Sequence, residues 1–406
     1  GPHWKKLREP GARTWGLGYY LDVLPKLVAE LQPDRPYWPG SPWSGSVDVH
    51  PNSGDFGDVH IWNVWHGAGQ YRNYLNWKPR FASEFGYHGP PTWPTLSRAI
   101  PPDQRRWDAP TMKLHNKNGR DGQVQTRERM ADDFVPPDAP EDFDNWWYLA
   151  QVMQARALAM GCEWFRALSP WCSGAVYWQY NDCWPVSSWS CLDGDGGRKP
   201  LWHATRRFFA PRLCTIKPTK PRAGDEVVHE LSVYLHNDDA QPWRGECVLR
   251  RVHVDGRVLA EERRAVDVPP RGPVKFDVPA AMADSRKDAA GFAQSFLVAS
   301  VGAGVERRGF WWFAADKDIR YPEPGFDLST RATGAGFDIV VKARTLLRDL
   351  CVFAERVGPA ARVLGQAVTL LPGDEHVLPV TGCGVIDAGK LRGRPVLQCA
   401  NWYGAA

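Results

Sequence analysis

The sequence lacks the features that mark several common classes of protein. No uninterrupted apolar run approaches the roughly 18 residues of a membrane span. The 50 Lys and Arg residues are offset by 46 Asp and Glu and are scattered rather than clustered. These absences argue against a membrane protein and against a nucleic-acid-binding surface, which needs a basic stripe. The nine cysteines show no C-x-x-C spacing, which argues against a zinc site and against a dense disulfide framework.

The first 20 residues contain neither an initiating Met nor the apolar segment of a secretion signal. The cysteines, which we expect to be free and buried, indicate a reducing compartment, and we predict a cytoplasmic protein. Scattered loop aspartates such as Asp55, Asp58, Asp193 and Asp195 are typical of solvated turns. We therefore predict neither a bound metal nor a cofactor.

Tryptophan, in contrast, is abundant and unevenly distributed. Of the 21 Trp residues, 17 lie within residues 1–203. The remaining four are Trp243, Trp311, Trp312 and Trp402. A chain of 406 residues exceeds what a single core usually serves, so the contrast indicates two or three domains that are built differently.

Residues 1–211 carry a pattern of short apolar strands alternating with helices. Strands are predicted at 36–42, 59–65, 80–85 and 174–180, and helices at 18–31, from Asp144 to just before Pro170, and at about 200–209. This alternation indicates βα units on a parallel sheet, about half of a (β/α)8 TIM barrel. The polar, Pro-rich segment 90–143 is too long for a simple connection and is expected to hold short helices or functional residues.

After Pro211 the pattern changes to alternating β-strands. Apolar and polar residues alternate at 227–235 and 274–278, and Asp255-Gly256 is typical of a hairpin turn. Further strands are predicted at 337–343, 350–357 and 367–373. We therefore predict an α/β plus all-β fold with three domains, which are about half of a (β/α)8 barrel at 1–211 and β-sandwiches at 212–317 and 318–406.

Functional residues of a parallel barrel lie at the C-terminal ends of its strands, and three predicted strand ends carry suitable side chains. Glu84 ends one strand, and Trp65 and His66 end another. Residues 177–185 alternate aromatic and polar side chains. This combination suits a sugar, because aromatic faces stack on the ring while polar groups bind its hydroxyls. The alternatives are a solvated surface Glu, a structural His and Trp side chains that only fill the core.

These residues resemble the C-terminal half of a β-mannosidase of glycoside hydrolase family 2. The matching stretches are RTWGLGYYLDVLPKLVAELQPDRPYWPGSP, GDVHIWNVWHG, RFASEFGYHGPPTWPTL and GAVYWQYNDCWPVSSWSCLDGDGGRKPLWHATRRFFAP. The resemblance is dense over residues 13–211 and thinner over the sandwiches. S-E-F-G alone is weakly specific, whereas its combination with W-x-V-W-H-G and Y-W-Q-x-N-D-C-W-P is strong.

The resemblance implies a retaining exo-glycosidase that hydrolyses terminal β-linked mannose through a glycosyl-enzyme. Glu84 matches the nucleophile at the end of barrel strand seven, His66 a hydrogen-bonding partner at the end of strand six, and Trp178 the aromatic floor under the mannose ring. Further substrate contacts are implied for Trp65, Asn181, Asp182 and Trp184. The partner is then a β-mannoside oligosaccharide or a glycoprotein-derived glycan.

The sequence departs from this family at the acid/base residue, which members carry as the Glu of an Asn-Glu pair shortly before the W-G-x-x-Y helix. None of the ten Asn residues is followed by Glu, so the acid/base is expected to be absent from this chain. We expect a fragment, inactive alone, whose partner is the missing N-terminal half of the enzyme. The alternatives are another exo-glycosidase of the family such as a β-glucosaminidase, an endo-β-mannosidase, and a non-catalytic carbohydrate-binding fragment.

Overall fold

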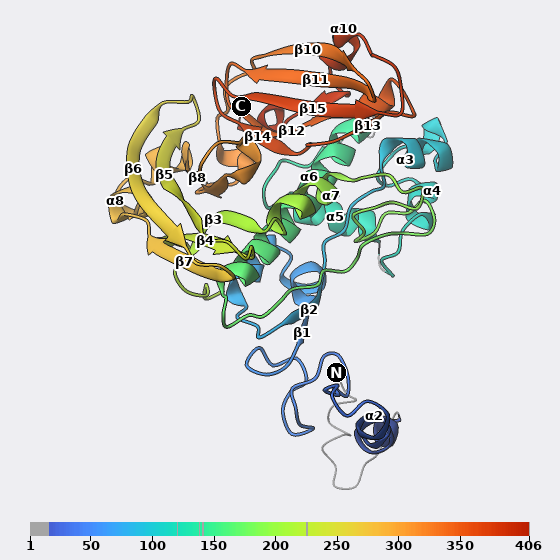
Figure 1. Cartoon of the computed structure of the whole chain (residues 1–406). Coiled ribbons are helices and arrows are strands. Elements are labelled where there is room, and N and C mark those ends of the chain that lie inside the picture. The colour runs from blue at the N-terminus through green and yellow to red at the C-terminus, as the bar shows by residue number, and fades with distance from the viewer. Residues whose placement is uncertain (1–15, 120, 138, 140–141, 225, 406) are drawn as a thin grey trace.

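The long helix α6 (Phe143–Ala167) lies at the centre of the molecule (Figure 1). The structure is a computed structural model, and it describes residues 16–119, 121–137, 139, 142–224 and 226–405. Of the 25 residues of α6, 17 are buried, as expected of a helix that protein surrounds on most sides. It packs against α7 (Pro200–Phe208) and the 3₁₀ helix η3 (Tyr71–Asn76). The helices predicted from Asp144 and at about 200–209 are confirmed, with ends shifted by at most two residues.

Three segments run parallel beside α6, and they carry the predicted strand ends. Strand β1 (Val59–Ile61) pairs in parallel with β2 (Ala82–Phe85). On the other edge of β2, residues 174–178 also run parallel, through hydrogen bonds from Ala82 N to Gly174 O (3.0 Å) and from Trp178 N to Phe85 O (2.8 Å). The parallel arrangement predicted from the alternating pattern is therefore present.

The predicted strand boundaries in this region need three corrections. The strand predicted at 59–65 ends at Ile61, and a π-helical turn η2 (Val64–Ala68) follows it up to Gly69, which has φ = 84°. Residues 174–180 pair with β2 only through isolated bonds and form no regular strand. Residues 36–42 form none either, which fits the prolines at 36, 39 and 42, since proline cannot donate to a sheet.

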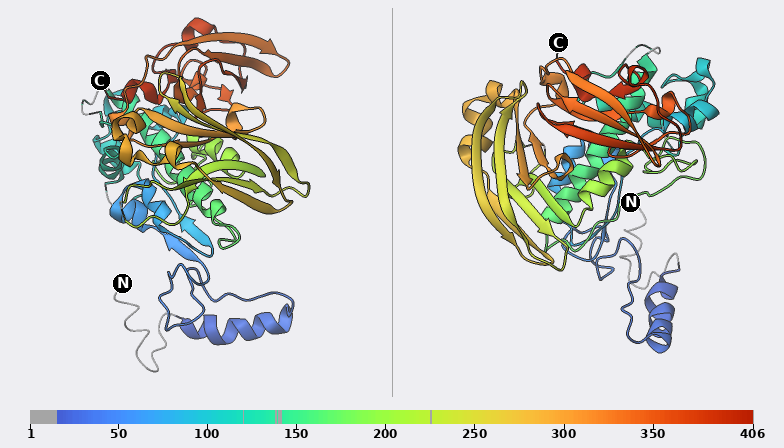
Figure 2. Two further views of the ribbon diagram at one scale, coloured as in Figure 1. Left: turned by 90° about the vertical axis from the view of Figure 1, so that its left-hand side faces the viewer. Right: turned by 45° about the horizontal axis from the view of Figure 1, so that its top comes forward.

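Short helices fill the long polar segment, as predicted. They are α3 (Trp93–Ala99), η4 (Pro102–Gln104), α4 (Pro110–Leu114) and α5 (Gly122–Met130). The predicted helix at 18–31 is also present, as η1 (Tyr19–Val23) continued by α2 (Leu24–Leu31). This helix projects away from the rest of the molecule (Figures 1 and 2), and none of its residues is buried. None of the described helices is long and apolar enough to cross a membrane.

The chain after α7 first forms two antiparallel sheets that face each other. One sheet has the order β3 (Arg212–Pro218), β4 (Leu231–Asn237), β7 (Gly272–Asp277), and the other β6 (Val258–Val268), β5 (Trp243–His253), β8 (Ser295–Val301), β9 (Gly309–Trp312). The predicted hairpin at Asp255-Gly256 joins β5 to β6, with Gly256 at φ = 97°. Short helices α8 (Ala280–Ala283), η6 (Ser285–Lys287), α9 (Ala289–Ala293) and η7 (Val305–Arg307) lie in the connections.

A second pair of antiparallel sheets follows (Figure 1). Its sheets have the orders β10 (Phe326–Thr333), β11 (Gly336–Ala343), β15 (Glu375–Thr381), β13 (Arg362–Val363) and β14 (Val368–Leu370), β12 (Leu347–Val352), β16 (Leu397–Gln398). Its short helices are η8 (Asp316–Asp318), η9 (Ala354–Arg356), α10 (Ala388–Leu391) and η10 (Ala400–Tyr403). The strand predicted at 350–357 is shorter, because the chain turns into η9 after Val352.

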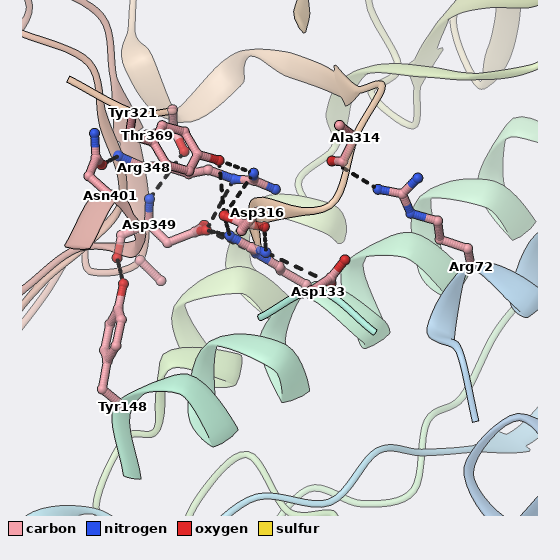
Figure 3. A network of polar contacts seen from close by, with 12 residues as sticks. Arg72, Asp133, Tyr148, Ala314, Asp316, Tyr321, Arg348, Asp349, Thr369 and Asn401 are labelled. Atoms are coloured by element: carbon pink, nitrogen blue, oxygen red, sulfur yellow. Dashed lines mark hydrogen bonds and ion pairs between the residues drawn. The ribbon is translucent and has the colours of Figure 1, made fainter. Parts of the chain in front are cut away.

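A buried ion network joins α6 to the second pair of sheets (Figure 3). Arg156 of α6 contacts Asp316 of η8 and Asp349 of β12, each at 2.6 Å between a guanidinium nitrogen and a carboxylate oxygen. Arg348 contacts the other oxygen of Asp316 at 2.9 Å. Burial acts to raise the pKa of Asp316, but the charges of Arg156 and Arg348 outweigh it and hold that pKa below its ordinary value.

Candidate active site

Glu84 lies at the C-terminal end of β2, between the other two parallel segments. The Trp62 indole Nε1 donates a hydrogen bond to its Oε2 at 2.9 Å. The His60 Nδ1 lies 3.3 Å from the same oxygen. The Glu84 side chain keeps 29% of its surface exposed, so a ligand can reach a carboxylate that two neighbours already orient.

His60 connects Glu84 to a second carboxylate. His60 and Glu84 are partners in the register between β1 and β2, which brings their side chains together. The other ring nitrogen of His60, Nε2, lies 2.9 Å from Ser41 Oγ, and Ser41 in turn donates to Asp58. Burial acts to raise the pKa of Asp58, but hydrogen bonds from Ser41, Ser83 and other donors lower it below its ordinary value. Asp58 is therefore a stable anion behind His60.

Indole rings surround the end of β2. A Cβ atom on Gly86 would lie 2.5 Å from the Trp178 carbonyl oxygen, 3.0 Å from the Trp62 ring and 3.1 Å from the Trp189 ring. Only glycine fits this close approach. Trp178 itself is 44% exposed, and it ends the segment that pairs with β2, because its backbone N–H donates to the carbonyl of Phe85, the residue after Glu84.

The structure places His66 in this aromatic group. Its ring centroid lies 5.6 Å from that of Trp62 and 6.2 Å from that of Trp189. Sequence interpretation expected His66 to contact Glu84, and it did not anticipate His60, whose Nδ1 lies 3.3 Å from that carboxylate. The signal that identifies His60 is strand register, because the pairing of β1 with β2 places His60 opposite Glu84.

Two residues that were predicted to contact the substrate are buried in the structure, so these two predictions are wrong. Trp65 is completely buried, with its ring stacked on His88 at 5.5 Å between centroids, because the π-helical turn carries it into the core. Asp182 is 5% exposed, and its carboxylate contacts Lys117 Nζ and accepts hydrogen bonds from the hydroxyls of Ser188 and Ser190, each at 2.5 Å. Asp182 therefore holds the loop together from inside.

The other two predicted rim residues stay accessible. Asn181 is exposed, and its side-chain amide donates to the Asp182 carbonyl at 3.0 Å. Trp184 is 37% exposed, with its ring 5.4 Å from that of His115. These side chains lie on the loop that follows Trp178, where a ligand could contact them.

Buried polar groups hold the loops around the site in place. Gln154 of α6 donates to the carbonyls of Tyr87 and Ser188 at 2.8 and 3.1 Å, which ties the chain after β2 to the loop after Trp178. His88 is also buried. Burial together with the charge of Lys199 lowers the pKa of His88 to about 3, so its ring stays neutral. The described residues contain no group of three or more His, Cys, Asp or Glu that could hold a metal ion.

Comparisons with known proteins agree with one another. No protein-family model matches the chain. It is 26% identical over 400 residues to Beta-mannosidase B of Thermothelomyces thermophilus, covering 90% of this chain and 44% of that protein. It is 28% identical over 386 residues to Beta-mannosidase B of Aspergillus terreus, covering 89% of this chain and 43% of that protein.

A solved structure gives the same result. The crystal structure of a β-D-mannosidase from Dictyoglomus thermophilum matches all of this chain with a TM-score of 0.81 and 25% identity, and the match covers 47% of that protein. The resemblance to β-mannosidases predicted from the sequence is confirmed. The chain spans less than half the length of the relatives that it matches.

Proposed function

We propose that the chain is part of a retaining exo-β-mannosidase in which Glu84 is the nucleophile. The observation that carries this proposal is the Glu84 carboxylate, which is oriented by Trp62 and His60, partly open to solvent and on the strand that pairs with the segment ending at the exposed Trp178. The likeness to β-mannosidases supports the reaction class.

In architecture, we propose that residues 1–211 form the second half of a (β/α)8 barrel and that the two pairs of sheets are immunoglobulin-like domains. The parallel order β1, β2 and residues 174–178, with helices between them, supports the barrel half. The antiparallel sheets that face each other support the sandwiches. All nine cysteines are free and seven of them are buried, which supports a reducing compartment such as the cytoplasm.

The mechanism needs two carboxyl groups, roughly 5 to 5.5 Å apart in retaining enzymes. The hydrogen bond from Trp62 and the contact of His60 are both with Oε2 of Glu84, so we assign the attack on the anomeric carbon to Oε1. A new bond then joins that carbon to Glu84, while the bond to the leaving oxygen breaks and that oxygen takes a proton from the acid. Water next attacks the anomeric carbon, gives a proton to the same residue and releases Glu84 as a carboxylate.

The acid/base carboxyl group and the rest of the barrel are proposed to come from the portion of the relatives that this chain does not span. Trp178 would stack on the mannose ring, and Asn181 and Trp184 would contact the outer part of a β-mannoside oligosaccharide or glycoprotein-derived glycan. The exposure of these three side chains supports the assignment.

Replacing Glu84 by Ala in the complete enzyme tests the proposal. Hydrolysis of an aryl β-mannoside should fall by several orders of magnitude, because no covalent intermediate can form. Added azide should then restore turnover and give α-mannosyl azide, since a small anion can occupy the space of the lost carboxylate. Near-normal hydrolysis by the E84A enzyme would refute the role of Glu84, and hydrolysis of an aryl β-glucosaminide in preference to the mannoside would favour the β-glucosaminidase alternative.

A further inference from the structure

Four donors converge on the carboxylate of Asp58. Trp38 Nε1 and the Trp43 backbone N–H each donate to Oδ1 at 3.1 Å. Ser83 Oγ donates to Oδ2 at 2.6 Å, and Ser41 Oγ donates to the same oxygen. A carboxylate can only accept hydrogen bonds. Each hydroxyl also has a longer alternative acceptor, Ser83 Oγ for Ser41 and the Val59 carbonyl for Ser83, both at 3.2 Å. We therefore assign both hydroxyl hydrogens to the shorter contacts with Asp58.

This arrangement decides which ring nitrogen of His60 carries hydrogen. A serine hydroxyl has one hydrogen, and that of Ser41 is used on Asp58. The Ser41 oxygen, 2.9 Å from His60 Nε2, must then accept, so Nε2 carries a hydrogen. The opposite nitrogen, Nδ1, lies 3.3 Å from a Glu84 oxygen, and an ionised carboxylate there also requires a donor.

We propose that Asp58 and Ser41 are positioning residues that hold His60 as an imidazolium against ionised Glu84. The logic is that of a catalytic triad, in which a buried carboxylate fixes the tautomer of an imidazole that it orients. The proposal rests on the proposed role of Glu84 and extends it to residues that do not touch the substrate. Two anions interact with His60 among the described residues, with Glu84 on the neighbouring strand and Asp58 reached through Ser41.

The imidazolium would act in both steps of the reaction. It favours the charged form of Glu84 before attack, because a nearby cation stabilises a carboxylate. It also stabilises Glu84 as the leaving group when water cleaves the glycosyl-enzyme. Loss of the Ser41 hydroxyl removes the acceptor for Nε2–H, so the ring should relax to a neutral form with its hydrogen on Nδ1, still donating to Glu84.

Nitrogen NMR of the 406-residue chain with ¹⁵N-labelled histidine rings tests this without any substrate. The signals of His60 are identified by their loss in H60Q. At neutral pH the wild-type ring should show two protonated nitrogens, S41A should show only one, and S41T, which keeps a hydroxyl, should behave as wild type. S46A, on the same loop but bonded to Asp48, should leave the spectrum unchanged. A neutral His60 in the wild-type chain, or the same spectrum in S41A, would overturn the proposal.

A kinetic readout in the complete enzyme separates this proposal from the proposed function. In S41A the acid limb of the pH profile of kcat/KM should move upward by about one pH unit. At a given pH on that limb, kcat/KM should therefore fall roughly tenfold, with KM little changed. An unchanged acid limb of kcat/KM in S41A would also overturn the proposed role of Asp58 and Ser41. If the complete enzyme hydrolyses no β-mannoside, the proposed function fails, while the NMR result still decides whether Asp58 and Ser41 control the charge of His60.

Discussion

Replacing Arg156 by Met should destabilise the described fold strongly, because Arg156 neutralises carboxylates that are buried between α6 and the second pair of sheets. Two cations, Arg156 and Arg348, serve three carboxylates, Asp133, Asp316 and Asp349. The variant leaves one cation for the same three anions. An uncompensated unit charge about 4 Å away is worth about 4 kcal/mol at an effective dielectric constant of about 20, which agrees with the roughly 3–5 kcal/mol observed when one partner of a buried pair is removed.

The assay is urea unfolding of the 406-residue chain, followed by tryptophan fluorescence. The matched control is R244M, because the Arg244–Asp267 pair is 73% and 60% exposed and should contribute under about 1 kcal/mol. Since the pKa of Asp316 is lowered in the folded chain, the stabilisation is present above the ordinary aspartate pKa and is lost as the pH falls through the lowered value. The difference between wild type and R156M should therefore shrink in acid. A loss no larger than that of R244M at neutral pH would refute this reasoning.

Three further substitutions probe the site. G86A should lower the free energy of unfolding by about 1–3 kcal/mol, because its methyl group would overlap the Trp178 carbonyl; an unchanged urea midpoint would contradict the packing. W62F in the complete enzyme should reduce kcat/KM for an aryl β-mannoside about 10- to 150-fold, the equivalent of one hydrogen bond to a charged group, and a change within twofold would show that the indole N–H is dispensable. Q154L should cost about 1–3 kcal/mol, since the carbonyls of Tyr87 and Ser188 lose their donor, and equal stability in urea would count against that bond.

Features that depend on local pattern could be predicted from the sequence. The helical spacing of apolar residues locates α6, and Asp255-Gly256 locates the hairpin between β5 and β6. Glu84 could be singled out as a candidate functional residue because it ends an apolar strand that a glycine follows. Each of these signals lies within a few residues along the chain, so no knowledge of the tertiary structure is needed.

The rest depends on contacts between distant residues. His60 contacts Glu84 because of the register between two strands, and a prediction that extended the first strand to Trp65 favoured His66 instead. Asp182 looks like an exposed loop acid in the sequence, and it is buried only because Lys117, from a separate segment, and two serines supply its partners. Burial of a polar side chain thus cannot be read from its neighbours along the chain.

Helix α2, with η1, bears on the proposal that a further segment completes the barrel. Tyr20, Val23, Leu27 and Leu31 are 50%, 52%, 46% and 68% exposed, and their spacing of three or four residues places them in one stripe along the helix. Exposed apolar patches mark interaction surfaces, and a single stripe fits a single packed neighbour. The proposed acid/base carboxylate must also approach Glu84 from outside the described residues. One further segment that packs on α2 would cover the stripe, and the same missing portion of the barrel is proposed to bring a second carboxylate toward Glu84.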